Sequence, residues 1–485
     1  MSGHRAGSGP GRALAGCDRI VGKPEPGLEI EPEHQCPMEN RARTVNSDPF
    51  PALRRTTEDV TRASSLLVAL LFWGTTAPLQ AQAGPLGVEE SVTLALEANP
   101  GFQSIRAALD ATRADLTVAR SSRYPSLGLS ASAARYETAG SGALDRHSVG
   151  LALRQTLYQG GQIGAQVDAA EATLEAGEEE LASARADLVL SVRQAWYGVA
   201  QGERLLVSSR EGLERSRLNL EYAEARLEAG LGTRPDVLRA RVDVSAAELE
   251  LTRARNILDS SLAVLNILMG RSPATPLEIR EAPTGATLPP LPSWEELREA
   301  ALEAREEVRA ARARTARQEA GVRLARGGFF PSISAEGEVS RGAVASRSPD
   351  ESWSLGVGLS LPLFQGFARR GDLRARQALL ESARFQELAV SQAVEGEVWE
   401  ALLAEEESAR RLENARTLFQ AAEENLEAAQ ESYRQGLGSI IALVDARTAF
   451  TGSEQTLIQA EYDRFVARAV LERMVWGDSF GGGQP

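Results

Sequence analysis

Hydrophobic positions recur along this chain with two different periods. Over 162–229 and 367–435 they fall every three or four residues without an interrupting proline, which predicts two very long helices. Shorter helical patterns at 235–269 and 440–476 follow them, and we expect these to return alongside the long helices. At ~1.5 Å per residue, each long helix would reach on the order of 100 Å, a length that no compact globular domain needs.

Four shorter segments alternate with a period of two. In the last of them, Trp353, Leu355 and Val357 are separated by serine or glycine. This pattern predicts β-strands with one apolar face and one small or polar face, at 124–136, 147–158, 330–341 and 351–362. Strands of about 9–11 residues with such faces are typical of transmembrane β-barrels, although a soluble hairpin buried on one face would alternate in the same way.

Aromatic residues and glycines mark the places where the predicted strands meet the long helices. The aromatics stand at four strand ends, where the interfacial girdle of a membrane barrel would lie: Tyr124, Tyr158, Phe330 and Phe364. Glycines follow and let the backbone bend from a tilted strand into a helix: Gly160, Gly161 and Gly366. On the polar strand face, Glu336 and Glu338 would face a water-filled lumen.

The chain contains one structural plan twice, displaced by 206 positions. Tyr124-Pro125-Ser126-Leu127 recurs as Phe330-Pro331-Ser332-Ile333. The best matches are proline, glycine and aromatic residues, so chance similarity between alanine-rich helices does not explain them. We therefore expect two copies, at 84–270 and 293–476, joined by a proline-rich linker at 271–292 and followed by a flexible tail at 477–485. The displacement is far longer than the ~20–50 residues of a solenoid repeat.

The N-terminal part has a different character. Residues 1–61 are rich in proline, glycine and charge without periodicity, so we expect an unstructured extension. Residues 62–83 have the features of a secretory signal: a positive residue, a short apolar run and the cleavage pattern Ala81-Gln82-Ala83. Because a signal belongs at an N-terminus, we expect translation to begin near Val60 and residues 1–59 to be a gene-model artefact.

Composition narrows the classes of function. The formal net charge is −14, which argues against nucleic-acid binding. Both cysteines, Cys17 and Cys36, precede the expected mature chain, whose single histidine is His147. Without a nucleophile and base, a metal-ligand cluster or a glycine-rich phosphate loop, the sequence indicates no enzyme, no cofactor and no metal.

Four strands per chain cannot close a barrel by themselves. An open strand edge in lipid leaves backbone groups unpaired, and bacterial single-chain barrels have at least eight strands. Several chains must therefore share one barrel, and a trimer would supply twelve strands. The expected fold class is mixed but mainly α: long antiparallel helical hairpins forming a trimeric α-barrel, plus four transmembrane β-strands per chain in a shared 12-stranded β-barrel. A periplasmic coiled-coil adaptor or scaffold is the alternative, and it explains the helices but not the strands.

The doubled order of helix, hairpin, long helix, glycine turn and return helix resembles the TolC family of outer-membrane efflux and secretion channels. The motifs that carry this resemblance are Leu157-Tyr158-Gln159-Gly160-Gly161, its counterpart Leu363-Phe364-Gln365-Gly366-Phe367, and Leu443-Val444-Asp445-Ala446-Arg447 after the second glycine turn. The resemblance covers about 87–476 and implies a homotrimer in outer-membrane lipid with a large periplasmic part. It also implies docking to a periplasmic adaptor (membrane fusion) protein and an inner-membrane transporter of RND or ABC type, in a tripartite efflux pump or a type I secretion system.

The resemblance further implies roles at the ends of the long helices. The adaptor would dock on two glycine turns, which could also be turn sequences only: Gly230, Leu231, Gly232 and Thr233, and Gly436, Leu437, Gly438 and Ser439. The family often narrows the closed pore with two carboxylates three residues apart. Here the second copy has Ala442 and Asp445 and the first has Asp236 and Arg239, so we expect single aspartates at the pore constriction, Asp445 and Asp236. Either could instead be an aspartate that stabilises a helix start.

Overall fold

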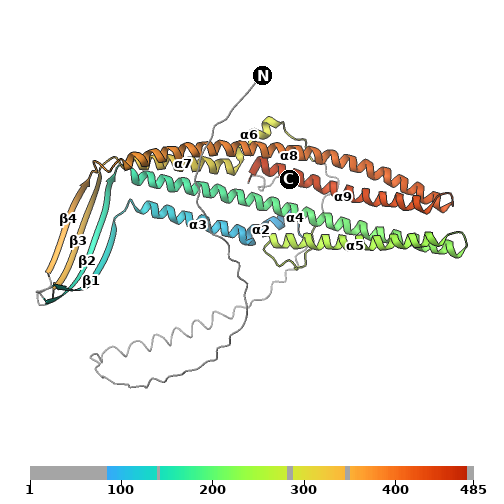
Figure 1. The fold of residues 1–485 in the computed structure, drawn as a ribbon, viewed down its shortest axis with the longest axis horizontal. Coiled ribbons are helices and arrows are strands. Elements are labelled where there is room, and N and C mark those ends of the chain that lie inside the picture. Colours follow the sequence, from blue (N-terminus) through green and yellow to red (C-terminus); the bar gives the residue numbers. More distant parts are fainter. Residues whose placement is uncertain (1–84, 139–141, 281–287, 345–349, 478–485) are drawn as a thin grey trace, which may run out of the picture. The chain divides into compact units, whose positions relative to one another are not determined.

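The computed structural model describes residues 85–138, 142–280, 288–344 and 350–477 (Figure 1). The expected extension at 1–61, the signal at 62–83, most of the tail and the middle of the linker lie outside these residues. The helices of the first copy are α2 Val88–Ala98, α3 Pro100–Ser121, α4 Gln162–Glu228 and α5 Arg234–Leu268. Those of the second are α6 Trp294–Ala304, α7 Glu306–Gly327, α8 Ala368–Arg434 and α9 Ile440–Trp476. The strands are β1 Ser126–Thr138, β2 Gly142–Gln159, β3 Ser332–Val344 and β4 Asp350–Ser360.

The duplication read from the sequence recurs in the structure. The starts of α2 and α6, of α3 and α7, of β1 and β3, of α4 and α8, and of α5 and α9 are each 206 positions apart. One tertiary hydrogen bond recurs at the same displacement. Asn99 Nδ2 donates to the carbonyl of Leu268 at 2.9 Å, and Arg305 Nη1 donates to that of Met474 at 3.2 Å. In both copies this bond joins the residue before the 22-residue helix, α3 or α7, to the end of the return helix, α5 or α9.

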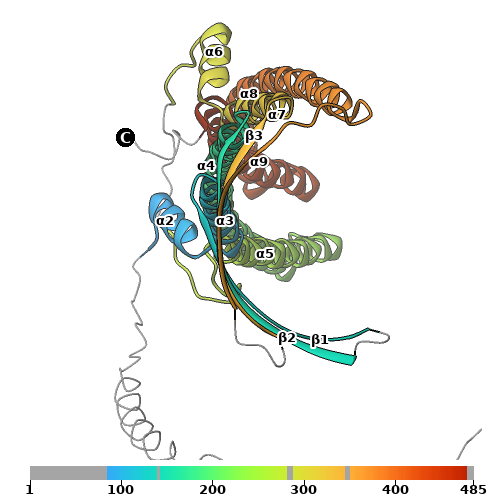
Figure 2. The same ribbon diagram turned by 90° about the vertical axis from the view of Figure 1, so that its left-hand side faces the viewer.

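The long helices are built alike and packed in one row. Helices α4 and α8 each have 67 residues. They can run this far because neither contains proline, the residue that most strongly breaks a helix. Helix α3 packs on α4, α4 on α7 and α7 on α8, and Figure 2 shows these four helices side by side in a curved row. The return helices α5 and α9 both contact α4.

One ion pair between neighbouring helices of this row appears in both copies, with the positive and negative residues exchanged. Arg113 of α3 pairs with Glu178 of α4 at 3.4 Å. At the equivalent positions, Glu319 of α7 pairs with Arg384 of α8 at 3.0 Å. Both pairs are largely exposed and add little stability, but their recurrence confirms that α3 lies on α4 as α7 lies on α8.

The four strands form one antiparallel sheet in the order β1-β2-β3-β4. Within the described residues, the outer edges of β1 and β4 have no strand partner. The first strand begins at Ser126 rather than 124, because the amide of Tyr124 still bonds to the carbonyl of Ser121 at 2.9 Å and Pro125 has no N–H. The second begins at Gly142 rather than 147, because it pairs with β1 up to Thr138.

In the second hairpin, too, the residues expected at the strand ends nearest the helices lie outside the strands. Strand β3 covers Ser332–Val344 rather than 330–341, since the amide of Phe330 bonds back to the carbonyl of Gly327 at 3.1 Å. Strand β4 covers Asp350–Ser360 rather than 351–362, since its last residue pairs with Ser332, the first of β3. The expected long and return helices agree with the structure to within one residue at each end.

The register places apolar residues of all four strands on one face of the sheet. Leu129 pairs with Leu151, which pairs with Val339, which pairs with Trp353. All of these side chains are exposed, as are most other large apolar residues of this face: Leu127, Val149, Leu153, Leu355, Val357 and Leu359. An exposed apolar area of this extent marks a surface that meets lipid or another protein.

The opposite face of the sheet is polar and held by side-chain pairs. Ser132 bonds to Ser148 at 2.8 Å and Ser340 to Ser352 at 2.9 Å. Arg154 pairs with Glu336 at 2.9 Å, so one of the two carboxylates assigned to the polar face has a cross-strand partner. The segregation of the two faces is what the period-two pattern predicted.

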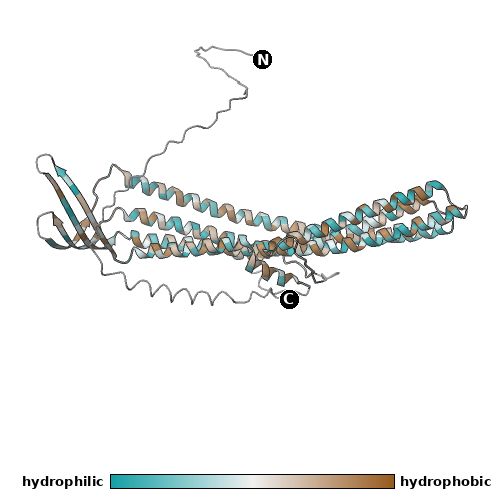
Figure 3. Cartoon of the chain, turned by 90° about the horizontal axis from the view of Figure 1, so that it is seen from below, coloured by the Kyte–Doolittle hydropathy of each residue, from teal (hydrophilic) through white to brown (hydrophobic). Residues whose placement is uncertain are grey.

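The buried residues form several clusters along the helices rather than one core. The largest lies where α2 and the end of α5 meet α4, around Val192, Trp196 and Leu265. Trp196 Nε1 donates to the carbonyl of Leu86 at 3.2 Å, which ties the start of the described chain to this cluster. Figure 3 shows apolar and polar residues interleaved along the full length of the helices.

None of the helices in the described residues is long and apolar enough to cross a membrane.

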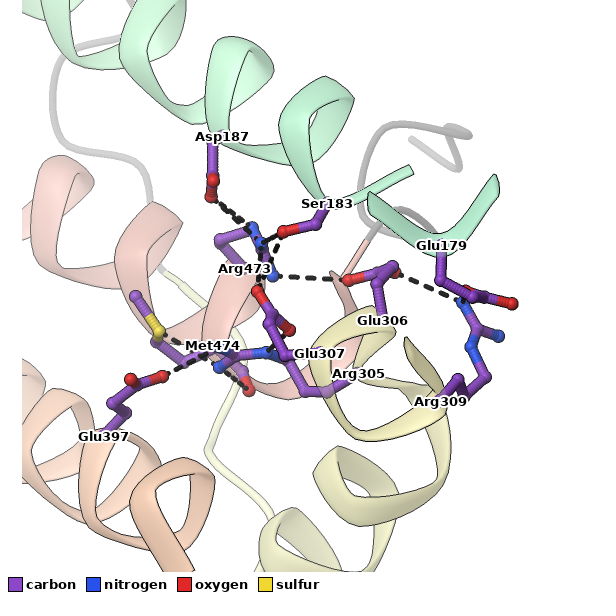
Figure 4. Close-up of polar contacts among 10 residues, drawn as sticks. All are labelled: Glu179, Ser183, Asp187, Arg305, Glu306, Glu307, Arg309, Glu397, Arg473 and Met474. Carbon is purple, nitrogen blue, oxygen red and sulfur yellow. Dashed lines mark hydrogen bonds and ion pairs between the residues drawn. The ribbon is translucent and has the colours of Figure 1, made fainter. Parts of the chain in front are cut away.

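A buried ionic cluster, which we call the central cluster, joins α4, α7, α8 and α9 (Figure 4). Arg473 of α9 has 1% of its surface exposed and reaches four groups: Asp187 and Glu307, each at 2.9 Å, Ser183 at 3.1 Å and Glu306 at 3.5 Å. Arg305, directly before α7, pairs with Glu307 at 2.7 Å and with Glu397 of α8 at 2.8 Å. Four helices are therefore tied together through three buried charged groups, Arg473, Glu306 and Arg305, whose partners Asp187 and Glu397 lie nearer the surface.

The carboxylates of the central cluster differ in environment. Burial alone would raise the pKa of Glu307, but the hydrogen bond and charge of Arg305, with Arg473, outweigh it and bring this pKa to about 2. Glu307 is therefore ionised at any physiological pH. Burial raises the pKa of Glu179, against the opposing charge of Arg309, 2.8 Å away.

Candidate functional site at the hairpin tips

The two turns assigned to adaptor docking have one backbone design. In each, the glycine after the long helix is left-handed, with φ of 72° at Gly230 and 77° at Gly436. The next two amides then bond to one carbonyl, that of Arg226 in the first turn and that of Ser432 in the second, at 2.9 to 3.0 Å. This closure ends the helix while satisfying carbonyls that would otherwise be unpaired.

The second glycine of each turn lies where the backbone approaches closely. A Cβ on Gly232 would lie 3.1 Å from the amide nitrogen of Leu227, and a Cβ on Gly438 would lie 3.1 Å from that of Tyr433. Between the glycines, Leu231 is 73% exposed and Leu437 is 82% exposed. Each tip therefore presents one apolar side chain on a compact turn.

The residues that follow the turns start the return helices. Thr233 donates its amide and its hydroxyl to Asp236 Oδ2 at 3.0 and 2.8 Å, and Ser439 Oγ accepts the amide of Ala442 at 3.2 Å. Asp236 thus serves the start of α5, the role that the sequence left open for it. Asp445 lies one turn further into α9 and is exposed.

A contact between the two tips was not found from the sequence. Arg226 Nη1 donates to the carbonyl of Tyr433 at 3.2 Å, and its Nη2 donates to that of Leu231 at the same distance. Its guanidinium also lies 5.1 Å from the ring of Tyr433 and 5.9 Å from that of Tyr222. Burial raises the pKa of Tyr433, and the positive charge of Arg226 partly opposes this shift.

Behind the tips, a cavity of about 500 Å³ lies between α4, α5 and α9. Arg447 reaches into it from α9 and bonds to Ser216 and to the carbonyl of Gly212. Burial lowers the pKa of Arg447, and Asp243 across the cavity opposes that shift. Burial in turn raises the pKa of Asp243, against the charge of Arg447.

At the other end of the long helices, the strand–helix bends are also left-handed. The φ values are 58° at Gly160, 78° at Gly161 and 58° at Gly366, as expected for bends that need glycine. The fourth position is Phe367, whose φ of 67° is unusual for a bulky residue. The four aromatics assigned to the membrane interface are all exposed near these bends: Tyr124, Tyr158, Phe330 and Phe364.

No group of three or more His, Cys, Asp or Glu side chains in the described ranges is arranged to hold a metal ion.

Comparison with known proteins identifies the family. The sequence pattern of the family described as outer membrane efflux protein matches residues 92–271 and 297–475, one match in each copy. These matches cover well over half of the chain, which therefore belongs to the outer membrane efflux protein family.

Individual relatives agree with this family. Protein CyaE of Bordetella pertussis is 30% identical over 320 residues, which are 62% of this chain and 66% of CyaE. Outer membrane protein OprJ of Pseudomonas aeruginosa is 28% identical over 403 residues, which are 80% of this chain and 83% of OprJ. The crystal structure of a membrane protein from Pseudomonas aeruginosa matches with a TM-score of 0.72 at 26% identity, over 80% of this chain and 93% of that one.

These findings define the class of function. The chain is an outer-membrane channel component for efflux or secretion, with a large periplasmic helical part, and it is not an enzyme. Its fold is that of the TolC-like trimeric channels, which combine an α-barrel with a β-barrel. Members of the family form trimers and work with adaptor and inner-membrane pump partners. Family membership thus favours the channel over the coiled-coil scaffold considered from the sequence.

Proposed function

We propose that three copies of this chain close into one continuous conduit across the outer membrane and the periplasm. The observation that carries this proposal is the sheet, which has two edges without strand partners in the described residues and one largely exposed apolar face. Joining β4 of one copy to β1 of the next satisfies both edges. It also turns the apolar face toward lipid, and the Ser- and Gly-rich face toward a lumen.

The exposed aromatics support a position of this barrel in the membrane. Tyr124, Tyr158, Phe330 and Phe364 lie at the strand–helix bends marked by Gly160, Gly161 and Gly366, where a ring of amphipathic side chains would sit at the lipid headgroups. The helices beyond the bends then extend into the periplasm.

The hairpin tips are the proposed adaptor-docking surface. Each offers an exposed leucine between two glycines, so that helices of an adaptor could approach the backbone closely and bury an apolar side chain. In this arrangement the adaptor connects the tips to an inner-membrane transporter of RND or ABC type.

Near the tips, the proposed constriction is a ring of three Asp445 carboxylates. Asp445 is exposed and has no polar partner among the described residues, whereas Asp236 is engaged by Thr233 at the start of α5 and adds its charge nearer the tip. A ring of carboxylates in a narrow pore favours cations over anions.

The first test of the conduit is the isolated protein. Extracted from outer membranes with detergent, it is expected to have the mass of three mature chains and to conduct ions in planar lipid bilayers. The protein should resist removal from membranes by carbonate or urea, because its strands are inserted in lipid. A monomeric particle in detergent, or recovery in the soluble periplasmic fraction, would contradict the proposal.

The proposed constriction predicts an effect on selectivity. Replacing Asp445 by Asn removes three charges from the ring and is expected to lower the cation-to-anion permeability ratio at least about twofold. Reversal potentials in a salt gradient across the bilayer measure this ratio. Asp259→Asn, at an exposed position in α5 away from the tips, is the matched control and should leave the ratio unchanged. Equal ratios in the two variants would remove Asp445 from the constriction.

A further inference from the structure

The bend between β2 and α4 packs tightly against the end of α7 within one chain. A Cβ on Gly160 would lie 2.3 Å from the carbonyl oxygen of Gly327 and 2.8 Å from the Cβ of Phe330. Gly160 therefore cannot be any other residue while α7 and the turn after it stay in place. This contact, the internal junction, joins the first copy of the structural plan to the second.

The equivalent bend in the second copy has the same backbone but no neighbour. Gly366 has a φ of 58°, the value found at Gly160, yet nothing lies within 4 Å of the position that its Cβ would take. The counterparts of Gly327 and Phe330, 206 positions earlier, are Ser121 and Tyr124. They end α3, on the opposite edge of the row of helices, so they cannot reach Gly366 of their own chain.

We infer that the turn Ser121–Tyr124 of a second copy of this chain occupies the space beside Gly366. The inference rests on the proposed homotrimer, and it specifies which residues meet at the subunit boundary. The contact within the chain is the template: α8 and α3 of the next copy meet as α4 and α7 meet within one chain. We call this contact the subunit junction.

The side chains at the two junctions are complementary in size. In the internal junction, a Cβ on Gly327 would lie 2.5 Å from Cγ of Gln162, so a small residue on α7 faces a large one on α4. The counterparts are Ser121 and Ala368, which reverse the assignment. Ser121 has the Cβ that Gly327 lacks, and Ala368 lacks the Cγ with which that Cβ would collide. The exchange removes the overlap with the side chain. Because a Cβ on Gly327 would also lie 2.7 Å from the carbonyl oxygen of Gly160, the two backbones must stand slightly further apart at the subunit junction than at the internal one.

A polar side chain also lies beside the subunit junction. Gln162 Nε2 donates to the carbonyl of Leu324 near the end of α7, at 3.3 Å. Ala368 cannot make the equivalent bond, but Arg369 follows it. Its Nε donates to Gln365 at 3.1 Å, while its Nη2 is buried without a hydrogen-bond partner in the described chain. A guanidinium is well suited to the negative end of the α3 dipole in the next copy.

A cavity of about 210 Å³ lies at the start of α8, next to the position of Gly366, and is lined by Phe329, Leu363, Phe364, Phe367 and Arg369 among others. Its mixture of aromatic and cationic side chains would also accept the headgroup of an anionic lipid. The vacant neighbour of Gly366 and the size exchange between Ser121 and Ala368 favour the protein occupant, because a lipid requires neither.

A disulfide tests the subunit junction directly. The mature chain has no cysteine, so Ser121→Cys with Ala368→Cys introduces the only two. Because the sulfur at 368 would lie about where Cγ of Gln162 lies in the internal junction, mild oxidation of the detergent particle should give covalent trimers on a non-reducing gel. Each single variant should give none. If light scattering shows three chains per particle and no cross-link forms, the junction is wrong while the trimer stands; a particle of one chain would overturn both.

A size exchange provides the second measurement. Ala368→Gln should collide with Ser121 of the next copy and raise the dissociation constant of each junction about tenfold. Adding Ser121→Gly recreates the pair Gly327 and Gln162 and should restore the constant to within about twofold. Rescue by the double variant supports the junction, since a mere folding defect or a displaced lipid would not be rescued. Independent, additive effects of the two substitutions would overturn it.

Discussion

Replacing Arg473 by Met is expected to lower the free energy of unfolding by about 3–5 kcal/mol. Methionine keeps much of the apolar volume of the arginine but removes the charge that faces Glu306, Glu307 and Asp187 in the central cluster. Glu306, with 1% of its surface exposed, would lose its ion pair with Arg473 at 3.5 Å and keep the one with Arg309 at 3.5 Å. An incompletely compensated buried charge is far more costly than the loss of an exposed pair.

Chemical denaturation followed by circular dichroism measures this effect. Arg113→Ala is the matched control, because it breaks the exposed pair with Glu178 and should cost no more than about 1 kcal/mol. Adding Glu306→Gln to Arg473→Met should recover part of the lost stability, since a buried carboxylate that has lost the charge of Arg473 is then replaced by a neutral amide. An Arg473→Met variant as stable as the control would mean that the central cluster does not hold the four helices together.

The central cluster also shows where inference from the sequence ends. Helix lengths, turns and strand faces follow from local periods and from glycine and proline, and those features were anticipated to within a few residues. Arg473 and Asp187 are 286 positions apart. Each is one of many charged residues on its own helix, so nothing local marks them as partners. Only the packing of α4, α7 and α9 brings them together.

The duplication carries more information than either copy alone, and it also misleads where the copies differ. Arg305 stands where the first copy has Asn99 and makes the equivalent bond to the return helix, although the residue type has changed. The tip contact differs more. Arg226 bridges the tips through Tyr433, whereas its counterpart Ser432 contributes only its carbonyl. Tyr222, Arg226 and Tyr433 would have indicated this contact if the two hairpins had been known to lie side by side. That arrangement belongs to the tertiary structure and is not visible in the sequence.

The small errors in the strands have a similar origin. Alternation predicts which face a residue occupies, because the side-chain period is two, but it does not predict where pairing starts. The helix-end hydrogen bonds of Tyr124 and Phe330 hold those residues out of the sheet. Likewise, the sequence did not predict the left-handed backbone of Phe367. The first copy has Gly161 at the equivalent position, and a phenylalanine keeps this conformation only where the surrounding structure holds it in place.

The second large effect is expected at the tips. Replacing Leu231 and Leu437 together by Asp should abolish export, reproducing the phenotype of a strain without the gene: lost tolerance to an exported compound or a missing secreted protein. If each leucine is a buried anchor in the complex, burying a carboxylate there in its place should weaken docking at least about 30-fold per tip. Both leucines are exposed on turns held by backbone hydrogen bonds, so the folded channel should not change.

Three comparisons separate docking from other causes. Leu231→Met with Leu437→Met keeps an apolar side chain at each tip and should retain export. The aspartate variant should still give a trimeric particle and conduct ions in bilayers with wild-type conductance, because the defect lies in contact with the adaptor and not in the conduit. Normal export by the aspartate variant would show that neither leucine contributes to docking, and the glycine turns would then be explained by helix reversal alone.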